Sequence, residues 1–177
     1  MPNQPNRAVS MLDIDGVLNP DKMRNPTKSG LTGYHKVDVP EHGIRIWVTK
    51  HHGRLLATLD ADIVWATTWV AHPDALAFAA DQYGIPTDLP EIFYDVTTDR
   101  DRTNTGKLDG VRSWLEDNNR TSAPLVWVDD DLGDKDAGWA EDRTAPTLLI
   151  KPIPHGGLTA DHYQQIGDFL AKQALYK

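Results

Sequence analysis

The chain has 177 residues, of which 40% are hydrophobic and 25% charged, and its net charge at pH 7 is −8. These values predict one globular domain with a real core, and they exclude a general positive coat for nucleic acid, although a nucleotide or a nucleic-acid end is still an acceptable substrate. The absence of cysteine excludes thiolate chemistry and disulfides. No apolar run reaches transmembrane length, and residues 1–7 are polar, without the apolar core of a signal peptide. We therefore expect a cytoplasmic protein with a flexible tail over 1–7 and no membrane partner.

Short apolar runs alternate with helical patterns, which predicts an α/β fold with a mainly parallel sheet. The first strand is expected over residues 8–14. Residues 19–40 are rich in Pro, Gly, Lys, Asn and Thr and indicate turns, whereas 44–49 alternate and predict a strand or hairpin arm. A short apolar helix face follows at 52–59, and a second buried strand is expected at 62–67.

The second half continues the alternation. Pro73 suits the first turn of a helix that runs to Tyr83. The remaining expected elements are a strand at 91–94, a polar loop at 95–104, a helix capped by Thr105 with Leu108, Val111 and Leu115 on one face, strands at 125–128 and 147–150, and a last helix capped by Thr159. The expected fold is a Rossmann-like three-layer sandwich with a mainly parallel five-stranded sheet. A single domain spans 1–177, with residues 17–50 as a flap or small insertion and a minimal cap or none.

Two carboxylates, Asp13 and Asp15, directly follow the first expected strand and precede Gly16. Alone, Asp-x-Asp-Gly is a weak motif, because it also occurs in turns and calcium loops; an EF-hand is excluded because its other acidic positions and its terminal Glu are missing. Carboxylates at a strand end lie at the sheet rim where open α/β folds bind ligands. One aspartate there can attack phosphorus or hold a metal, and the other can supply a proton.

Other polar residues fall at equivalent places: Thr67 ends a strand, Lys107 begins a helix, and Asp129-Asp130 end another strand. The carboxyl ends of parallel strands share one edge, so these groups can converge. A carboxylate nucleophile divides phosphoester hydrolysis into two steps, and a metal and a cation must then offset its repulsion from phosphate. Magnesium prefers such oxygen ligands, and a hydroxyl and an ammonium can hold the phosphoryl oxygens.

Each position also has a simpler interpretation. Thr67 can cap a strand, with Thr68 as an alternative, and Lys107 can be a solvated helix residue. The histidines show no zinc spacing, and the pair His51-His52 is expected at the surface. Trp65, Trp69, Trp127 and Trp139 are expected in the core, with Trp69 the strongest candidate for a substrate platform.

The ordered set resembles the haloacid dehalogenase (HAD) superfamily of phosphatases and phosphotransferases. Its four motifs match Asp13-Ile14-Asp15-Gly16, Thr67, Lys107 and Asp129-Asp130. The runs Asp-Gly-Val-Leu-Asn, Trp-Ala-Thr-Thr-Trp and Val-Trp-Val-Asp-Asp-Asp are similar to a narrower group of small HAD domains, found alone in actinobacteria and their phages and fused to RNA-repair proteins.

This resemblance implies that Asp13 is the nucleophile and a Mg²⁺ ligand. Asp15 would be general acid and then base, with its backbone carbonyl on the metal. Thr67 and Lys107 would bind phosphoryl oxygens, and Asp130, with Asp129 beside it, would complete the metal site; these two are exchangeable in register. The implied function is Mg-dependent hydrolysis of a phosphomonoester through an aspartyl-phosphate, with a nucleic-acid end favoured and a 5′- or 3′-nucleotide as the alternative. A non-catalytic metal- or phosphate-binding interaction domain is the alternative of another class, and the oligomeric state stays open.

Overall fold

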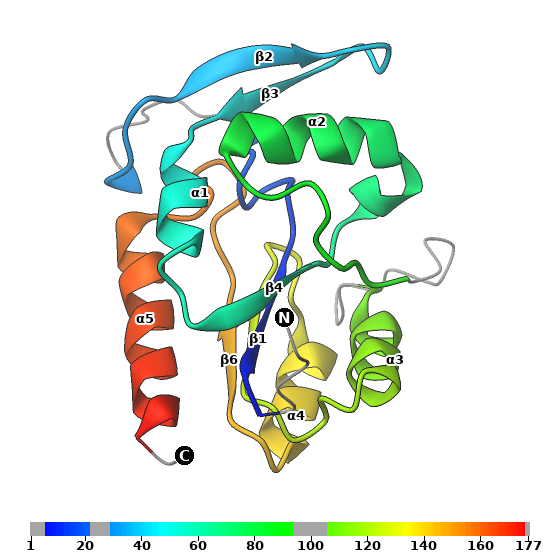
Figure 1. Ribbon diagram of the computed structural model, residues 1–177, viewed down its shortest axis with the longest axis vertical. Coiled ribbons are helices and arrows are strands. Elements are labelled where there is room, and N and C mark those ends of the chain that lie inside the picture. The colour runs from blue at the N-terminus through cyan, green and yellow to red at the C-terminus, as the bar shows by residue number, and fades with distance from the viewer. Residues whose placement is uncertain (1–5, 22–28, 94–105, 176–177) are drawn as a thin grey trace.

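The computed structural model describes residues 6–21, 29–93 and 106–175 (Figure 1). The strands are β1 (Ala8–Leu12), β2 (His35–Val39), β3 (Ile44–Val48), β4 (Ala61–Trp65), β5 (Leu125–Val128) and β6 (Thr147–Ile150). The helices are α1 (His51–Leu56), α2 (Pro73–Tyr83), α3 (Leu108–Asp117), α4 (Asp134–Asp142) and α5 (Ala160–Ala174), with a short 3-10 helix, η2 (Thr68–Ala71), before α2.

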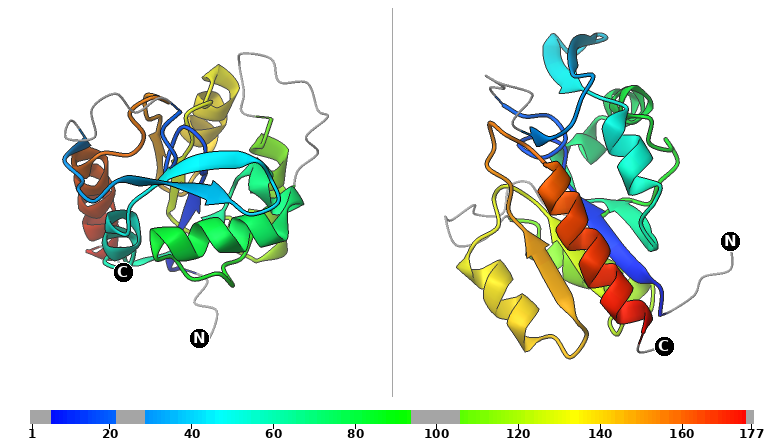
Figure 2. Two further views of the ribbon diagram at one scale, coloured as in Figure 1. Left: turned by 90° about the horizontal axis from the view of Figure 1, so that it is seen from above. Right: turned by 90° about the vertical axis from the view of Figure 1, so that its left-hand side faces the viewer.

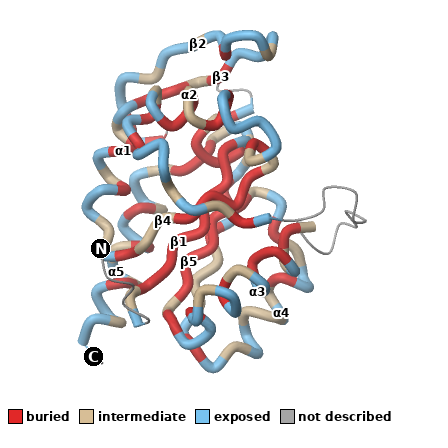
Figure 3. The backbone as a smooth tube through the Cα atoms, turned by 45° about the vertical axis from the view of Figure 1, so that its right-hand side comes forward, coloured by how far each residue is buried: buried red, intermediate tan, exposed pale blue. Residues whose placement is uncertain are grey.

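The main sheet is parallel, with the strand order β4-β1-β5-β6. Leu12 of β1 pairs with Trp65 of β4 on one side and with Val128 of β5 on the other, so these three strands end at one edge. Every residue of β1 and β5 is buried (Figure 3). Strands buried on both faces read as continuous apolar runs, which is why their positions could be predicted from the sequence.

Two hydrophobic clusters cover the two faces of this sheet. Successive side chains of a strand point to opposite faces, so Leu12 belongs to one cluster and Met11 to the other. Residues of α1, α2 and α5 join the first cluster, and residues of α3 and α4 join the second (Figures 1 and 2). The expected three-layer α/β sandwich is confirmed.

The strand count differs from the expectation, because the main sheet has four strands among the described residues. Glu91 forms only an isolated bridge with Trp65, flanked by hydrogen bonds from Trp65 N–H to the Pro90 carbonyl and from Ile92 N–H to the Trp65 carbonyl. Pro90 has no N–H to extend a ladder. The predicted strand at 91–94 is therefore reduced to one bridge, and Tyr94, the predicted loop at 95–104 and the Thr105 cap lie outside the described residues.

An antiparallel hairpin of β2 and β3 lies across the carboxyl end of the main sheet, beside α2 (Figures 1 and 2). The interpretation of residues 19–40 as turns alone was wrong, because β2 lies within them. Four of the five β2 residues are exposed or half-buried (Figure 3), so the strand carries little apolar signal. The predicted hairpin arm at 44–49 is confirmed as β3.

One surface assignment was also wrong. His52 of α1 is fully buried, and its two ring nitrogens lie 3.0 Å from the Tyr34 hydroxyl and 2.8 Å from the Tyr163 hydroxyl. The two tyrosines satisfy both ring nitrogens, which is why a polar ring can lie in this core. Within the ranges that the structure describes, no helix is long and apolar enough to cross a membrane.

Candidate active site

Asp13 lies directly after β1 and is 8% exposed. Its Oδ1 accepts a hydrogen bond from the Ile14 N–H at 2.7 Å, and its Oδ2 accepts one from Lys107 Nζ at 2.6 Å. Its backbone N–H donates to the Val128 carbonyl at 3.1 Å, so the pairing of β1 with β5 continues to the residue itself. The sheet therefore fixes the backbone of Asp13, and two donors fix its carboxylate.

Lys107, the residue before α3, is 3% exposed. Its Nζ donates to Asp13 Oδ2 and, at 2.7 Å, to Asp129 Oδ2. Burial lowers the pKa of this ammonium, but the two carboxylates outweigh burial and hold that pKa above its ordinary value. The interpretation of Lys107 as a solvated helix residue is therefore wrong: it is a buried cation shared by two aspartates.

The acidic pair after β5 divides into a buried and a half-buried member. Asp129 is fully buried, and besides Lys107 it accepts a hydrogen bond from the Asp131 N–H at 2.9 Å. Burial raises the pKa of the Asp129 carboxyl, an effect that Lys107 opposes. Asp130 is half-buried, and burial, aided by the charge of Asp13, raises the pKa of its carboxyl to about 6. Burial and, after it, the charge of Asp13 thus raise the pKa of both carboxyls, as expected where a cation is to be bound.

The carboxylates form a potential metal centre. Asp13, Asp129 and Asp130 each offer one oxygen, and these three oxygens lie within 4.8 Å of one another. Such an all-oxygen set fits a hard divalent cation. Among the described residues, this cluster contains Asp13 and the acidic pair but not the carboxylate of Asp15, the fourth predicted metal residue, which was expected to act through its backbone carbonyl.

A tight loop carries Asp15 out of this cluster. Gly16 has φ +69°, a conformation that favours glycine, and a Cβ there would lie 2.3 Å from Asp130 Cγ. Asp15 is exposed, and its carboxylate accepts hydrogen bonds from Asn19 Nδ2 at 2.7 Å and Trp69 Nε1 at 2.8 Å. The sequence did not lead us to predict Asn19 and Trp69 as hydrogen-bond donors to Asp15. The signal that could have identified them is their place in the runs Asp-Gly-Val-Leu-Asn and Trp-Ala-Thr-Thr-Trp.

Thr67 lies at the same edge, two residues beyond β4, since the β1–β4 register pairs Leu12 with Trp65. It is fully buried, and its Oγ1 accepts a hydrogen bond from the Trp69 N–H at 3.4 Å as the N-cap of η2. Its neighbour Thr68 begins η2. All the predicted site residues therefore lie at the carboxyl edge or, for Lys107, contact residues there.

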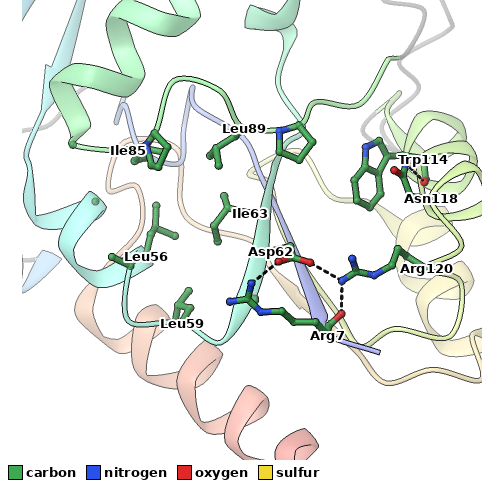
Figure 4. Close-up of a pocket in the computed structure, with 16 residues that line it drawn as sticks. Arg7, Leu56, Leu59, Asp62, Ile63, Ile85, Leu89, Trp114, Asn118 and Arg120 are labelled. Carbon is green, nitrogen blue, oxygen red and sulfur yellow. Dashed lines mark hydrogen bonds and ion pairs between the residues drawn. The ribbon is translucent and has the colours of Figure 1, made fainter. Parts of the chain in front are cut away.

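A separate cavity of about 1070 Å³ lies along β4 (Figure 4). Apolar side chains such as Leu56, Ile63 and Leu89 line it, together with Asp62, which forms ion pairs with Arg7 at 2.6 Å and Arg120 at 2.9 Å. None of the clustered aspartates lines this cavity, which is therefore separate from the potential metal centre.

A comparison with known families adds a second line of support. Residues 9–163 match the family described as "HAD domain in Swiss Army Knife RNA repair proteins". The chain belongs to this HAD family. No curated protein and no solved structure matches the chain. Membership confirms the resemblance drawn from the four motifs and indicates a HAD-type hydrolase.

Proposed function

We propose that this HAD domain is a Mg²⁺-dependent phosphomonoester hydrolase that works through an aspartyl-phosphate on Asp13. The observation that supports this most strongly is the arrangement around Asp13: a nearly buried carboxylate, an ammonium at 2.6 Å and two further carboxylates within metal-binding reach. A nucleophilic carboxylate needs this environment, because positive charge must offset its repulsion from phosphate.

The reaction has two steps with divided roles. In the first, an Asp13 oxygen attacks phosphorus, the bond from phosphorus to the leaving oxygen breaks, and Asp15 gives its proton to that oxygen. In the second, Asp15 takes a proton from water as the water oxygen attacks the aspartyl-phosphate, which releases phosphate and restores Asp13. Thr67 and Lys107 bind non-bridging phosphoryl oxygens, where charge develops.

The surroundings of Asp129 and Asp130 support different roles for these two residues. Asp13 and Asp130 would hold the metal through their carboxylates, and Asp15 through its backbone carbonyl. Asp130 suits this role because it is half-buried beside Gly16, the residue that follows Asp15. The carboxylate oxygens of Asp129 already accept from Lys107 and the Asp131 N–H, so its main task is to anchor that ammonium. When bound, Mg²⁺ would neutralise charge between the nucleophile and the phosphoryl group.

We further propose that the phosphate belongs to a nucleic-acid end. The family description names RNA repair proteins, which supports such a substrate. The described part of the excursion between β1 and α1 is a loop and a small hairpin, and Asp15 is exposed, which suits a large substrate. The net charge of −8 favours recognition of an end over general binding of the polymer.

A substrate panel tests this proposal. Free mononucleotides and oligonucleotides with 5′- or 3′-phosphates are compared in Mg²⁺ and in excess chelator. We expect Mg²⁺-dependent phosphate release, with kcat/KM higher for phosphorylated oligonucleotides. A preference for mononucleotides would support the nucleotide phosphatase instead, and Mg²⁺ binding without turnover on any phosphoester would support the non-catalytic domain.

The matched variants are Asp13→Asn and Asp109→Asn. Both exchange a carboxylate for an amide, but the Asp109 side chain is 95% exposed on α3. We expect Asp13→Asn to abolish turnover with an unchanged circular dichroism spectrum, and Asp109→Asn to retain wild-type turnover. Full activity in Asp13→Asn would overturn the proposed role of Asp13.

A further inference from the structure

Asp15 is held from both sides by groups that belong to different parts of the fold. Trp69 Nε1 donates to its Oδ2 and Asn19 Nδ2 donates to its Oδ1. We propose that Trp69 and Asn19 are positioning residues that fix the Asp15 carboxyl for proton transfer to the leaving group. This inference rests on the proposed function.

The position of Trp69 is itself fixed. The residue is 7% exposed, its backbone N–H donates to Thr67 Oγ1, and its carbonyl accepts from the His72 N–H at 2.8 Å. The indole of Trp69 has a single N–H, and Asp15 accepts the hydrogen bond that it donates. The turn that follows Thr67 therefore sets the place of Asp15 as well.

The hairpin fixes the orientation of Asn19. The Asn19 Oδ1 accepts a hydrogen bond from the Trp47 N–H of β3 at 3.0 Å, and the Trp47 carbonyl accepts from the Tyr83 hydroxyl of α2 at 3.1 Å. Because the amide oxygen faces a backbone donor, the NH₂ group of Asn19 must face Asp15. The hairpin and α2 thus help to fix the position of the Asp15 carboxylate through the side chain of Asn19.

The hydrogen-bonding chemistry of Trp69 and Asn19 limits which groups can accept the proton of Asp15. An indole N–H and an amide NH₂ are donors only, so neither can accept a proton from Asp15. Asp15 is also an exposed residue, so substrate or water can reach it. The clamp therefore holds one orientation of the carboxyl and leaves substrate or water as the acceptor, which is the preorganisation that general acid catalysis requires.

Leaving-group dependence tests this role. The variant Trp69→Phe removes the indole N–H and keeps an aromatic ring. The control Trp65→Phe makes the same change at a buried tryptophan whose Nε1 has no hydrogen-bond partner among the described residues. Each protein is assayed on an alkyl phosphate, whose leaving group needs a proton, and on p-nitrophenyl phosphate, whose leaving group departs as an anion. The ratio kcat/KM reports the steps through transfer to Asp13.

For Trp69→Phe we expect kcat/KM to fall roughly tenfold or more on the alkyl phosphate, a part of the usual general-acid contribution, and much less on the nitrophenyl ester. Asn19→Ala, which deletes the other donor, should show the same asymmetry if Trp69→Phe does not fold. Trp65→Phe should change both substrates equally.

Equal losses on both substrates in Trp69→Phe and Asn19→Ala, with an active wild type, would overturn this inference alone, because a merely structural role has no leaving-group dependence. An inactive wild type would overturn the proposed function as well. An independent readout is the Trp69 indole N–H resonance, which should move in Asp15→Ala while that of Trp65 does not; an unmoved Trp69 resonance would overturn the clamp itself.

Discussion

At the scale of single residues, the feature that depends most on correct charge pairing is an ammonium buried between two carboxylates. Lys107 is 3% exposed, and Asp13 and Asp129 lie 2.6 Å and 2.7 Å from its Nζ. Taking such charges out of water is costly unless each one is paired. Lys107 is the cation that pairs with both carboxylates, which makes it structural for the site as well as a proposed phosphate ligand.

Lys107→Met should destabilise the fold strongly, because it leaves two buried carboxylates without their cation. We expect the free energy of unfolding, measured by urea denaturation without metal, to fall by about 3–5 kcal/mol. The control is Arg112→Met, which removes an α3 cation that is 52% exposed and 3.8 Å from Asp109; it should cost less than about 1 kcal/mol. Similar costs in the two variants would contradict this description of the buried cluster.

Gly16 permits the loop and also the approach of Asp130. Gly16→Ala should cost about 1–2 kcal/mol from its positive φ, and its Cβ should also displace the Asp130 carboxylate and reduce Mg²⁺-dependent turnover at least tenfold. Gly43→Ala is the matched control, because Gly43 has φ +64° with nothing within 4 Å of its Cβ position. It should show the backbone cost and keep activity. Wild-type turnover in Gly16→Ala would argue against a role for Asp130 at the metal.

At the scale of elements, sequence patterns predicted those parts that bury their apolar residues. The runs of β1, β5 and β6, the Pro73 start of α2 and the Thr159 cap of α5 all appear in the structure. The strand β2 was missed because it is mostly exposed. The helix α4 was missed because it buries little beyond Asp136, which accepts from the Gly133 N–H at its start. A helix or strand that buries few apolar side chains shows no periodic apolar pattern, so its sequence does not reveal it.

Helix α1 gives a pH-dependent contribution to stability. Burial, and to a lesser degree the neighbouring His51, lowers the pKa of His52 to about 3. The unfolded chain takes up a proton on this ring below its ordinary pKa of about 6.5, whereas the folded chain does not. The contribution of His52 is therefore complete above pH 6.5 and is lost as the pH falls toward 3.

His52→Gln removes this titration. Unfolding free energies of wild type and variant should converge below pH 6.5 by up to about 1.4 kcal/mol per pH unit, since the slope reflects one proton. His155→Gln, the same exchange at an exposed histidine, is the matched control. A constant difference between wild type and His52→Gln from pH 7 to pH 4 would show that His52 is not buried as a neutral ring.

At the scale of the whole molecule, the sheet assembles the site from distant segments. Asp13, Thr67 and Asp129 come from three adjacent parallel strands, so the topology alone brings them to one edge. Their types and order could be read from the sequence. The burial of Lys107, the difference between Asp129 and Asp130, and the bonds from Trp69 and Asn19 to Asp15 could not, because they depend on side-chain placement across elements rather than on local pattern.

A phosphoryl group bound to Asp13 distinguishes the proposed mechanism from direct attack by water, and trapping the phosphorylated protein detects it. A rapid acid quench during turnover of p-nitrophenyl phosphate, followed by peptide mass spectrometry, locates any phosphoryl group. We predict it on Asp13 in the wild type, at higher occupancy in Asp15→Asn because water then lacks its base, and nowhere in Asp13→Asn. Turnover by wild type and Asp13→Asn alike, with no phosphoryl group on Asp13 in any of the three proteins, would contradict nucleophilic attack by Asp13.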